Sequence, residues 1–141
     1  MHPRPREISG EQRDRLVRQL KDLLQGKPEI RLALLHGSFP TGSSFRDVDL
    51  ALYLDPEKIE KEAFRDYELE QGVRWSTDCG LPVDVRLLND APLAFRYHAL
   101  KGTVLLARDT EFLDELRART WDDYCDFAPF AKKYLREVIG G

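Results

Sequence analysis

The sequence predicts a single domain of the α/β (α+β) class, with a mixed central sheet of about four strands flanked by helices. Two observations support this fold class. Short apolar or alternating runs, typical of strands, occur between longer segments of helical periodicity, and Gly or Pro stands at most of the junctions. The chain has 141 residues, 42% of them hydrophobic, which is enough for one core but not for a second large domain.

The first expected element is an amphipathic helix that begins near Ser9 and ends at Gly26. Ser9 and Gln12 have the spacing of a capping box, and apolar residues recur on one helical face after them. Gly26 and Pro28 are typical of a helix C-terminus. Residues 1–29 are therefore interpreted as an N-terminal helical segment that precedes the core.

Four strands are expected in the core, which spans residues 30–107. Ile30–His36 is a short apolar run, typical of a strand buried in the centre of a sheet. Asp47–Leu54 and Leu81–Asn89 alternate apolar and polar residues, which indicates strands with one buried face. Thr103–Ala107 is a fourth, apolar strand.

Two helices are expected between these strands. The first runs from about Glu57 to Gly72 and is charged and weakly amphipathic. The second runs from about Pro92 to Lys101, with Asp90 as its N-terminal cap and Gly102 after its end. The expected inward stripe of the first helix consists of Ile59, Ala63 and Tyr67.

The C-terminal segment, residues 108–141, is expected to be helical from Asp109 onward. Pro129 lies inside it and should kink or break the helix, because proline lacks an N–H donor and clashes with the preceding turn. No repeat or linker separates the segment from the core, so residues 1–141 are interpreted as one domain. Its candidate buried positions are Phe112, Leu113, Leu116, Tyr124, Phe127, Ala131, Tyr134 and Leu135.

Composition argues against nucleic-acid and membrane partners. The formal net charge is −3 and the isoelectric point about 5.7, so no overall basic surface attracts a polynucleotide. No apolar run is long enough to cross a bilayer, and the N-terminus lacks the apolar core of a signal peptide. Cys79 and Cys125 have neither metal-ligand nor disulfide spacing, which fits a reducing compartment. We expect a cytoplasmic protein.

Three aspartates are the strongest functional signal. Asp47 and Asp49 stand two residues apart at the head of a strand, so their side chains project to the same face. Asp84 lies on the polar face of a later strand and joins them if the two strands are neighbours. Carboxylates gathered in this way repel one another unless a cation neutralises them. Such oxygen ligands select Mg²⁺ or Mn²⁺, which complete their shells with water and substrate phosphates.

The Gly37-Ser38 pair supplies a candidate phosphate site beside these carboxylates. It directly follows a strand, and the segment SFPTG could form a short helical turn with Ser38 near its cap. Free amides at such a turn, with a glycine that allows close approach, bind anions. Either motif alone is more often a turn or a solvated strand end, but the two together with the third aspartate favour function.

The motifs carry a family resemblance. LLHGSFPTGSSFRDVDLALYL together with PVDVRLL resembles the DNA polymerase beta-like nucleotidyltransferase superfamily, whose signature is Gly-Ser, Asp-x-Asp and a later carboxylate. The small size resembles the minimal nucleotidyltransferase family. The segment Phe112–Ile139, with its Tyr-x-Asp-Phe-x-Pro core, is similar to the tail of the MntA-like antitoxins that accompany HEPN-domain toxins. The loop from Ser38 to Asp47 is a couple of residues shorter than in many members.

The resemblance implies a nucleotidyltransferase fold and a role for each motif residue. Gly37 and Ser38 would hold the β- and γ-phosphates of ATP. Asp47 and Asp49 would bind two Mg²⁺ ions, with Mn²⁺ as an alternative. Asp84 would be the third metal ligand and would help to activate the attacking hydroxyl. The reaction would be in-line attack on the α-phosphorus with release of pyrophosphate.

The resemblance also implies the partner. In MntA-like antitoxins, AMP is transferred from ATP to a tyrosine hydroxyl of the cognate HEPN-domain toxin, an RNase, which is thereby neutralised. A hetero-oligomeric complex with the toxin follows, without direct nucleic-acid contact. Two alternatives stay open. One is a nucleotidyltransferase for a small molecule such as an aminoglycoside, although a further substrate-binding domain is absent. The other is a catalytically silent antitoxin that only masks its toxin, although the intact aspartates argue against it.

Other residues are interpreted more cautiously. His36 adjoins the Gly-Ser pair, and packing is favoured over catalysis for it. Arg46 could reach a phosphate or pair with the carboxylates. Arg86 shares a strand face with Asp84 and is expected to be its ion-pair partner. An aromatic group near the C-terminus is expected to be mostly core, with one side available for a partner helix. That group consists of Trp121, Tyr124, Phe127, Phe130 and Tyr134.

Overall fold

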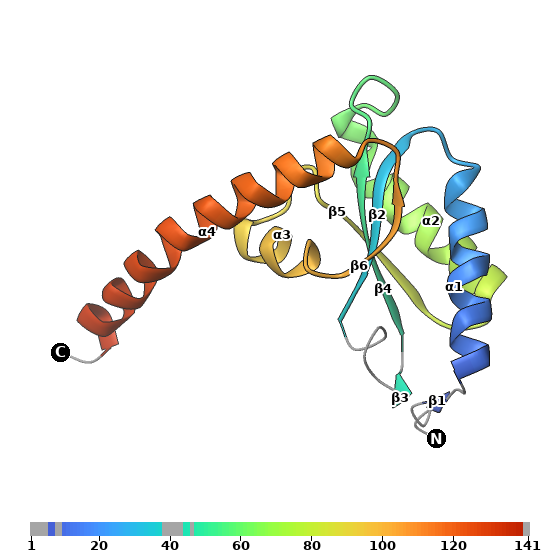
Figure 1. The fold of residues 1–141 in the computed structure, drawn as a ribbon, viewed down its shortest axis with the longest axis horizontal. Helices are drawn as coiled ribbons and strands as arrows, with labels where there is room; N and C mark the ends of the chain where they lie inside the picture. The colour runs from blue at the N-terminus through green and yellow to red at the C-terminus, as the bar shows by residue number, and fades with distance from the viewer. Residues whose placement is uncertain (1–5, 8–9, 38–43, 46, 140–141) are drawn as a thin grey trace.

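The residues that the structure describes form a four-stranded mixed sheet with two helices on each face (Figure 1). The computed structural model describes residues 6–7, 10–37, 44–45 and 47–139. The strand order is β5–β4–β2–β6. The strands of this sheet are β2 (Ile30–His36), β4 (Val48–Leu54), β5 (Val83–Leu87) and β6 (Thr103–Ala107).

Helices cover both faces of the sheet. α1 (Gly10–Gln25) and α2 (Phe64–Cys79) pack on one face, and α3 (Leu93–Ala99) and α4 (Thr110–Ile139) pack on the other. A short 3-10 helix, η1 (Lys61–Ala63), precedes α2. The distal part of α4 projects away from the sheet as an arm (Figure 1). The predicted fold class, a mixed sheet flanked by helices with a helical C-terminus, is confirmed.

Pairing within the sheet explains how its strands are connected. β2 lies between β4 and β6 and is antiparallel to both, which confirms its predicted central position. β4 and β5 are parallel, so the chain must cross over between them, and α2 provides that crossover. β1 (Arg6–Glu7) and β3 (Ser44–Phe45) form a separate antiparallel ribbon that the sequence did not predict. Both are two residues long and carry no periodic signal.

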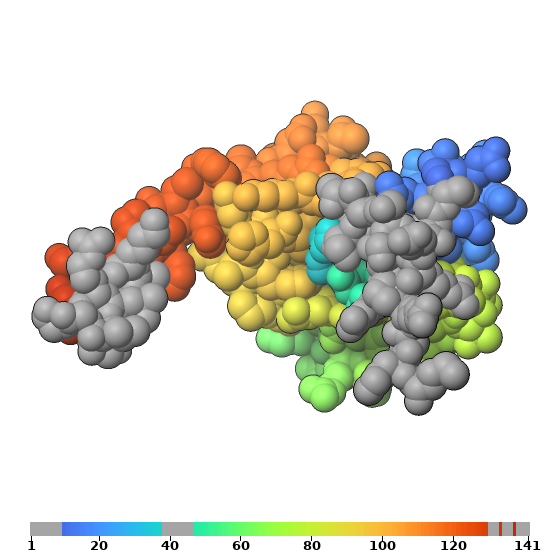
Figure 2. Space-filling model, turned by 90° about the horizontal axis from the view of Figure 1, so that it is seen from below, coloured from blue at the N-terminus to red at the C-terminus, as the bar shows by residue number. Residues whose placement is uncertain are grey.

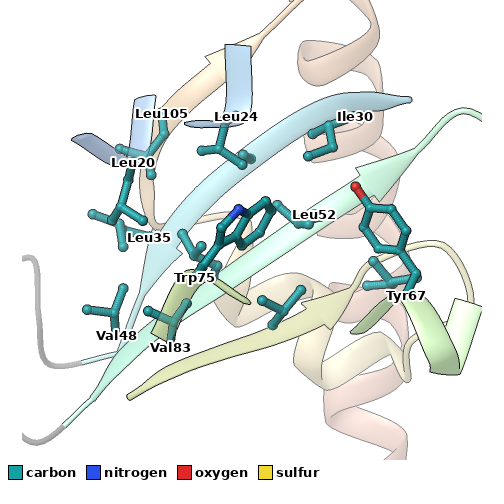
Figure 3. Packing of buried hydrophobic residues seen from close by; sticks show 14 of the residues in the cluster. Leu20, Leu24, Ile30, Leu35, Val48, Leu52, Tyr67, Trp75, Val83 and Leu105 are labelled. Atoms are coloured by element: carbon teal, nitrogen blue, oxygen red, sulfur yellow. The ribbon is translucent and has the colours of Figure 1, made fainter. Parts of the chain in front are cut away.

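The larger core lies between the sheet and helices α1 and α2 (Figure 3). Trp75 of α2 is 1% exposed and packs there with Leu20 and Leu24 of α1, which are fully buried. The hydroxyl of Tyr67 donates a hydrogen bond of 2.8 Å to a carboxylate oxygen of Glu29 at the edge of this core. This layer fixes the crossover helix α2 against β5.

The smaller core lies on the opposite face, under α3 and the first half of α4. Leu32 and Leu34 of β2 and Ala51 of β4 are buried there. The rings of Tyr53 and Phe112 meet edge to face, with their centroids 4.9 Å apart. Because β4 alternates, the face that carries Ala51 and Tyr53 also carries Asp49.

The helix predicted from Glu57 to Gly72 differs from the helix observed. The chain turns after Asp55, and α2 begins only at Phe64 and continues to Cys79. Gly72 does not end it, because α2 packs on β5 through that position and the left-handed cap comes at Gly80. Of the predicted inward stripe, Tyr67 is buried, Ile59 is half-buried and Ala63 is exposed. The buried residues of α2 are Tyr67, Gln71 and Trp75.

The predicted cap of α3 is wrong. Asp90 does not cap α3, whose N-cap is Pro92; Asp90 instead lies 3.7 Å from the ammonium of Lys61. Of the two outcomes predicted for Pro129, a kink or a break, the break is not observed, because α4 runs through Pro129 as one helix of 30 residues.

Along α4 the predicted buried positions are confirmed only in its first half. Leu113 and Leu116 are buried and Phe112 and Tyr124 are partly buried, but Phe127 is 50% exposed. The side chains of Ala131, Tyr134 and Leu135 lie outside the described residues. None of the helices in the described ranges combines the length and the apolar character needed to cross a membrane.

Candidate active site

The predicted aspartates gather at one end of the sheet. Asp49 on β4 is in register with Asp84 on the parallel neighbour β5. Asp47 immediately precedes β4, and its side chain is hydrogen-bonded to that of Asp49. On the other side of Asp49, the register of β2 places His36 opposite it. Figure 2 shows this end of the molecule, with the end of β2 and the start of β4 visible in cyan and teal beside α3.

Strand alternation explains why the carboxylates share one face. Val48 and Leu50 point into the larger core, so Asp49 between them points to the opposite side. On β5 the same alternation buries Val83 and leaves Asp84 exposed. The predicted proximity of these aspartates is therefore a direct result of the parallel register of β4 and β5.

Gly37 brings backbone against the carboxylate of Asp49. Its φ angle is 79°, in the left-handed region that favours glycine. A Cβ atom at this position would lie 2.5 Å from Oδ2 of Asp49, so any side chain here would force that carboxylate to shift. Gly37 therefore permits two things at once, the turn out of β2 and the close approach to Asp49.

The aspartates alter one another's affinity for protons. Burial and the negative charges of Asp47 and Asp84 raise the pKa of Asp49 to about 6, and the hydrogen bond with Asp47 adds to this effect. Full ionisation of the group is thus costly in the folded protein. A cation bound at these oxygens would remove that cost.

The group has the donor chemistry of a Mg²⁺ or Mn²⁺ site but not its closed geometry. Within the described ranges, no set of three or more His, Cys, Asp or Glu side chains is arranged to hold a metal ion. Carboxylate oxygens are nevertheless the ligands that Mg²⁺ prefers. The pKa of Asp49 is raised partly because the negative charges of Asp47 and Asp84 beside it are not neutralised. The residues therefore fit a divalent cation, provided that their side chains adjust on binding.

A packed group borders the aspartates on the α3 side. The ring of His36 meets the ring of Phe95 of α3 edge to face, with the two centroids 5.4 Å apart. The guanidinium of Arg86 lies over the same Phe95 ring, with its Cζ atom 3.9 Å from the ring centroid. Burial and the positive charge of Arg86 lower the pKa of His36, against an opposing effect of Asp84. Nε2 of His36 is buried and has no hydrogen-bond partner among the described residues. His36 is thus a neutral, packed neighbour of the site.

The predicted ion pair between Arg86 and Asp84 is not observed among the ion pairs of the described residues, because Arg86 stacks on Phe95 instead. Phe95 was not predicted as a site residue. It has no polar group and no motif, and only the packing of α3 on the sheet reveals its position. Ser38, the helical turn expected after it and Arg46 lie outside the described residues.

The aromatic group near the C-terminus lies apart from the aspartates. Tyr124 of α4 stacks on Tyr97 of α3, with centroids 3.8 Å apart and planes 4° from parallel. Trp121 lies next to this pair and is 53% exposed. Trp121 and Phe127 have side chains that are at least half exposed and Tyr124 is partly buried, whereas the side chains of Phe130 and Tyr134 lie outside the described residues.

The sequence matches a known family model over most of its length. The model is described as polymerase beta, nucleotidyltransferase, and it matches residues 18–111. That range contains Gly37, Ser38 and the three aspartates. No curated protein sequence matches the chain significantly.

Solved structures share the fold at low sequence identity. A chain of a tri-AMPylated Shewanella oneidensis HEPN toxin in complex with MNT antitoxin is 16% identical, with a TM-score of 0.69 over 90% of this chain and 98% of that chain. A chain of the toxin–antitoxin MntA–HepT is 15% identical, with a TM-score of 0.64 over 93% and 99%. A chain of a toxin–antitoxin with AMP-PNP is 17% identical, with a TM-score of 0.65 over 94% and 99%.

Proposed function

This chain belongs to the polymerase beta nucleotidyltransferase family. We propose that it transfers AMP from ATP to a tyrosine hydroxyl of a HEPN-domain toxin. The transfer neutralises the toxin, so the chain acts as the antitoxin of a toxin–antitoxin pair. The reaction takes place in the cytoplasm, in a complex of the two proteins. The observation that carries the proposal is the group of three aspartates, with Asp49 in register with Asp84.

Asp47, Asp49 and Asp84 are the residues that would hold Mg²⁺, with Mn²⁺ as an alternative. When bound, the metal supplies positive charge for the phosphate oxygens of ATP and for the attacking and leaving oxygens. The oxygen donors and the raised pKa of Asp49 support this assignment.

The other steps of the reaction are assigned to residues of this chain. Gly37 and Ser38 bind the β- and γ-phosphates, and the left-handed turn at Gly37, directly beside Asp49, supports this role. Asp84 orients the tyrosine hydroxyl and accepts its proton. The tyrosine oxygen bonds to the α-phosphorus, the bond from that phosphorus to the bridging oxygen breaks, and pyrophosphate leaves. Phe95 holds His36 and Arg86 beside the aspartates and limits the access of water from that side.

The antitoxin role is supported by the solved structures of similar fold. Their chains include those of HEPN toxin with MNT antitoxin, one with a tri-AMPylated toxin and one with AMP-PNP. The similarity extends over 90% of this chain and 98% of the matched chain.

Mass spectrometry tests the proposal. The protein is incubated with ATP, Mg²⁺ and the HEPN-domain protein encoded by the neighbouring gene, and the mass of that partner is measured. We expect a gain of one or more AMP units, which is lost in the Asp47→Ala plus Asp49→Ala variant. The matched control is Asp122→Ala plus Asp123→Ala, since these two aspartates are exposed on α4 away from the site.

The outcomes separate the alternatives. Tight binding without a mass gain would leave a silent antitoxin that masks its partner. Neither binding nor mass gain, with AMP transfer to an aminoglycoside instead, would favour a small-molecule nucleotidyltransferase. A gain that persists in the Asp47 and Asp49 variant would remove the aspartates from the reaction.

A further inference from the structure

We infer that the acceptor protein docks on the outer side of α2 and in the groove between α2 and β5, with Leu69 and Val73 as its apolar anchors. We call this surface the α2–β5 face and define it by Leu69, Val73, Gly72, Asp84 and Arg86. The inference rests on the proposed function and adds the surface through which the acceptor is recognised.

The order of the strands indicates that ATP and the acceptor protein approach the site from different sides. Gly37 follows β2, Asp49 lies on β4, and Asp84 lies on β5 at the edge of the sheet. In-line displacement requires the attacking oxygen to approach opposite the leaving group. With the phosphates at Gly37, the acceptor must therefore come from the β5 side.

A groove of about 690 Å³ opens on that side of the sheet. Asp84 lines it together with its strand neighbour Arg86, so the groove reaches the edge strand at the position of Asp84. From α2 it is lined by Leu69, Gly72 and Val73. At Gly72 the helix packs closely on β5, since a Cβ atom there would lie 3.4 Å from the carbonyl oxygen of Val83.

The rim of the groove is apolar where a surface helix is usually polar. Leu69 is 62% exposed and Val73 is 70% exposed, one turn apart on the outer face of α2. The opposite face of α2 is buried through Tyr67, Gln71 and Trp75, so Leu69 and Val73 contribute little to the fold. Adjacent apolar side chains of this kind are typical of a protein interface.

Acidic side chains border the two anchors and indicate the chemistry of the partner. A second, shallower groove beyond the anchors is lined by Asp66, Glu70 and Asp78 together with Arg74. Glu70 pairs with Arg74 at 3.4 Å, whereas neither Asp66 nor Asp78 has an ion pair within the described residues. The complementary patch is therefore apolar at its centre and basic where it meets this second groove, whereas the first groove also carries Arg65 and Arg86.

Addition of a strand to β5 is not the mode of docking. The outward N–H of Val83 already donates to Oγ of Ser76 at 2.8 Å, and that of Leu87 donates to Oε2 of Glu68 at 2.9 Å. Two of the edge donors that a new strand would need are therefore occupied from α2. The acceptor therefore docks through side-chain contacts with Leu69 and Val73.

The other exposed apolar residues lie on α4 and do not border an aspartate. Trp121 and Phe127 are each about half exposed. The pocket beside Trp121 is lined by residues of α3, α4 and the turn after α3, not by Asp84.

Binding and transfer assays with paired variants test the inference. Leu69→Glu plus Val73→Glu places charge on the anchors, and Trp121→Glu plus Phe127→Glu is the matched control on α4. Titration calorimetry measures the Kd for the HEPN-domain protein, and mass spectrometry measures kcat/KM for AMP transfer. We expect the α2 pair to raise Kd at least tenfold and to lower kcat/KM by a similar factor. The α4 pair should change both less than twofold.

Two further measurements keep the result interpretable. Both variants should keep the thermal midpoint and the affinity for a fluorescent ATP analogue, because all four residues are exposed. Unchanged Kd and kcat/KM in the α2 pair would overturn the inference, as would losses confined to the α4 pair. If the wild-type protein binds its partner but transfers no AMP, the proposed function fails while the Kd values still decide the docking surface. If it does not bind, both fail.

Discussion

Among single residues, Gly37 is as important to the candidate site as the aspartates that it faces. Its backbone has φ of 79°, and a Cβ atom would collide with Oδ2 of Asp49. Gly80 has nearly the same φ, 75°, but open space where its Cβ would lie. Substituting the two glycines in turn therefore separates the effect of backbone strain from the effect of displacing the carboxylate of Asp49.

Gly37→Ala should strongly reduce AMP transfer, and Gly80→Ala should not. Each substitution costs about 1 kcal/mol of stability, because alanine is strained at these φ values. Only Gly37→Ala also pushes Asp49 out of place, so we expect a loss of more than tenfold in kcat/KM. Urea denaturation gives the first quantity and mass spectrometry of the partner the second. Equal activities of the two variants would contradict a role for the close contact.

The raised pKa of Asp49 predicts an unusual pH dependence of stability in metal-free protein. Because the pKa is about 6 when folded and near 4 when unfolded, the folded chain holds the proton more tightly. The free energy of unfolding therefore falls as the pH rises from about 4 to about 6, and it stays lower above that range. Screening of this half-buried group limits the effect to about 1 kcal/mol.

Asp49→Asn should remove that dependence. The variant is expected to be about 1 kcal/mol more stable than the wild type at pH 7 without divalent cations, and equally stable at pH 4. Thermal unfolding across this range measures the difference, about 3 °C at pH 7 for a domain of this size. Asp114→Asn, on the exposed side of α4, serves as the control. A wild type that is more stable than Asp49→Asn at pH 7 would show that the aspartates do not repel.

The sequence predicts some site residues and misses others for a physical reason. Asp49 and Asp84 could be brought together from the alternation of two strands, because neighbouring strands align residues of the same face. Phe95 and the position of Arg86 could not, because they depend on how α3 packs over the sheet. A charged neighbour in the sequence suggested an ion pair with Asp84, but an aromatic face elsewhere in the chain holds Arg86 instead.

At the scale of helices and strands, the turn between α1 and β2 is held by Arg108, which directly follows the C-terminal end of β6. Arg108 donates from Nε to the carbonyl of Ile30 at 2.7 Å, and from Nη2 to the carbonyls of Gln25 and Lys27 at 3.1 and 3.0 Å. These carbonyls include one at the C-terminus of α1, where a cation is also favoured by the helix dipole. The contact links residues about 80 positions apart.

Arg108→Met should therefore loosen the link between α1 and the sheet. The three hydrogen bonds involve a charged donor, so we expect a loss of about 2 kcal/mol in the free energy of unfolding. Arg119→Met, at an exposed position on α4, should change it by less than 0.5 kcal/mol. Urea denaturation measures both. Similar values for the two variants would mean that the carbonyls of Ile30 and Gln25 are satisfied by water.

Strands were predicted more accurately than helix ends. Ile30–His36 and Thr103–Ala107 have the predicted bounds, because a buried strand is a continuous apolar run with polar or glycine residues at its ends. The bounds of α2 and the run of α4 through Pro129 were not predicted. Gly72 is unfavourable in an isolated helix, but packing on β5 outweighs this local preference, and α4 continues through Pro129.

In the molecule as a whole, the fold leaves the site open on two sides. The sheet is covered on both faces, but Gly37 at the end of β2 and Asp84 on the edge strand β5 flank Asp49 from opposite directions. A donor and an acceptor can thus reach the same carboxylates without competing for one entrance. The α4 arm lies away from both approaches (Figure 1).

Binding of ATP at this site can be measured through the thermal stability of the protein, because a ligand that binds only the folded chain raises the free energy of unfolding. A ligand at 100 times its Kd adds about 2.7 kcal/mol to the free energy of unfolding. For this domain that is about 8 °C in thermal midpoint. We expect Mg²⁺ with a non-hydrolysable ATP analogue to give such a shift in the wild type, and Mg²⁺ alone to give a smaller one. Asp47→Asn plus Asp49→Asn should lose both shifts.

The two effects of that double variant have opposite signs, which makes the prediction demanding. Without ligand it should unfold at a higher temperature than the wild type, because the repulsion at Asp49 is gone. With Mg²⁺ and the analogue the order should reverse, since only the wild type gains binding energy at these oxygens. A general loss of folding cannot produce this crossing. If the double variant instead keeps the full shift with the analogue, the nucleotide is held elsewhere and the assignment of Asp47 and Asp49 fails.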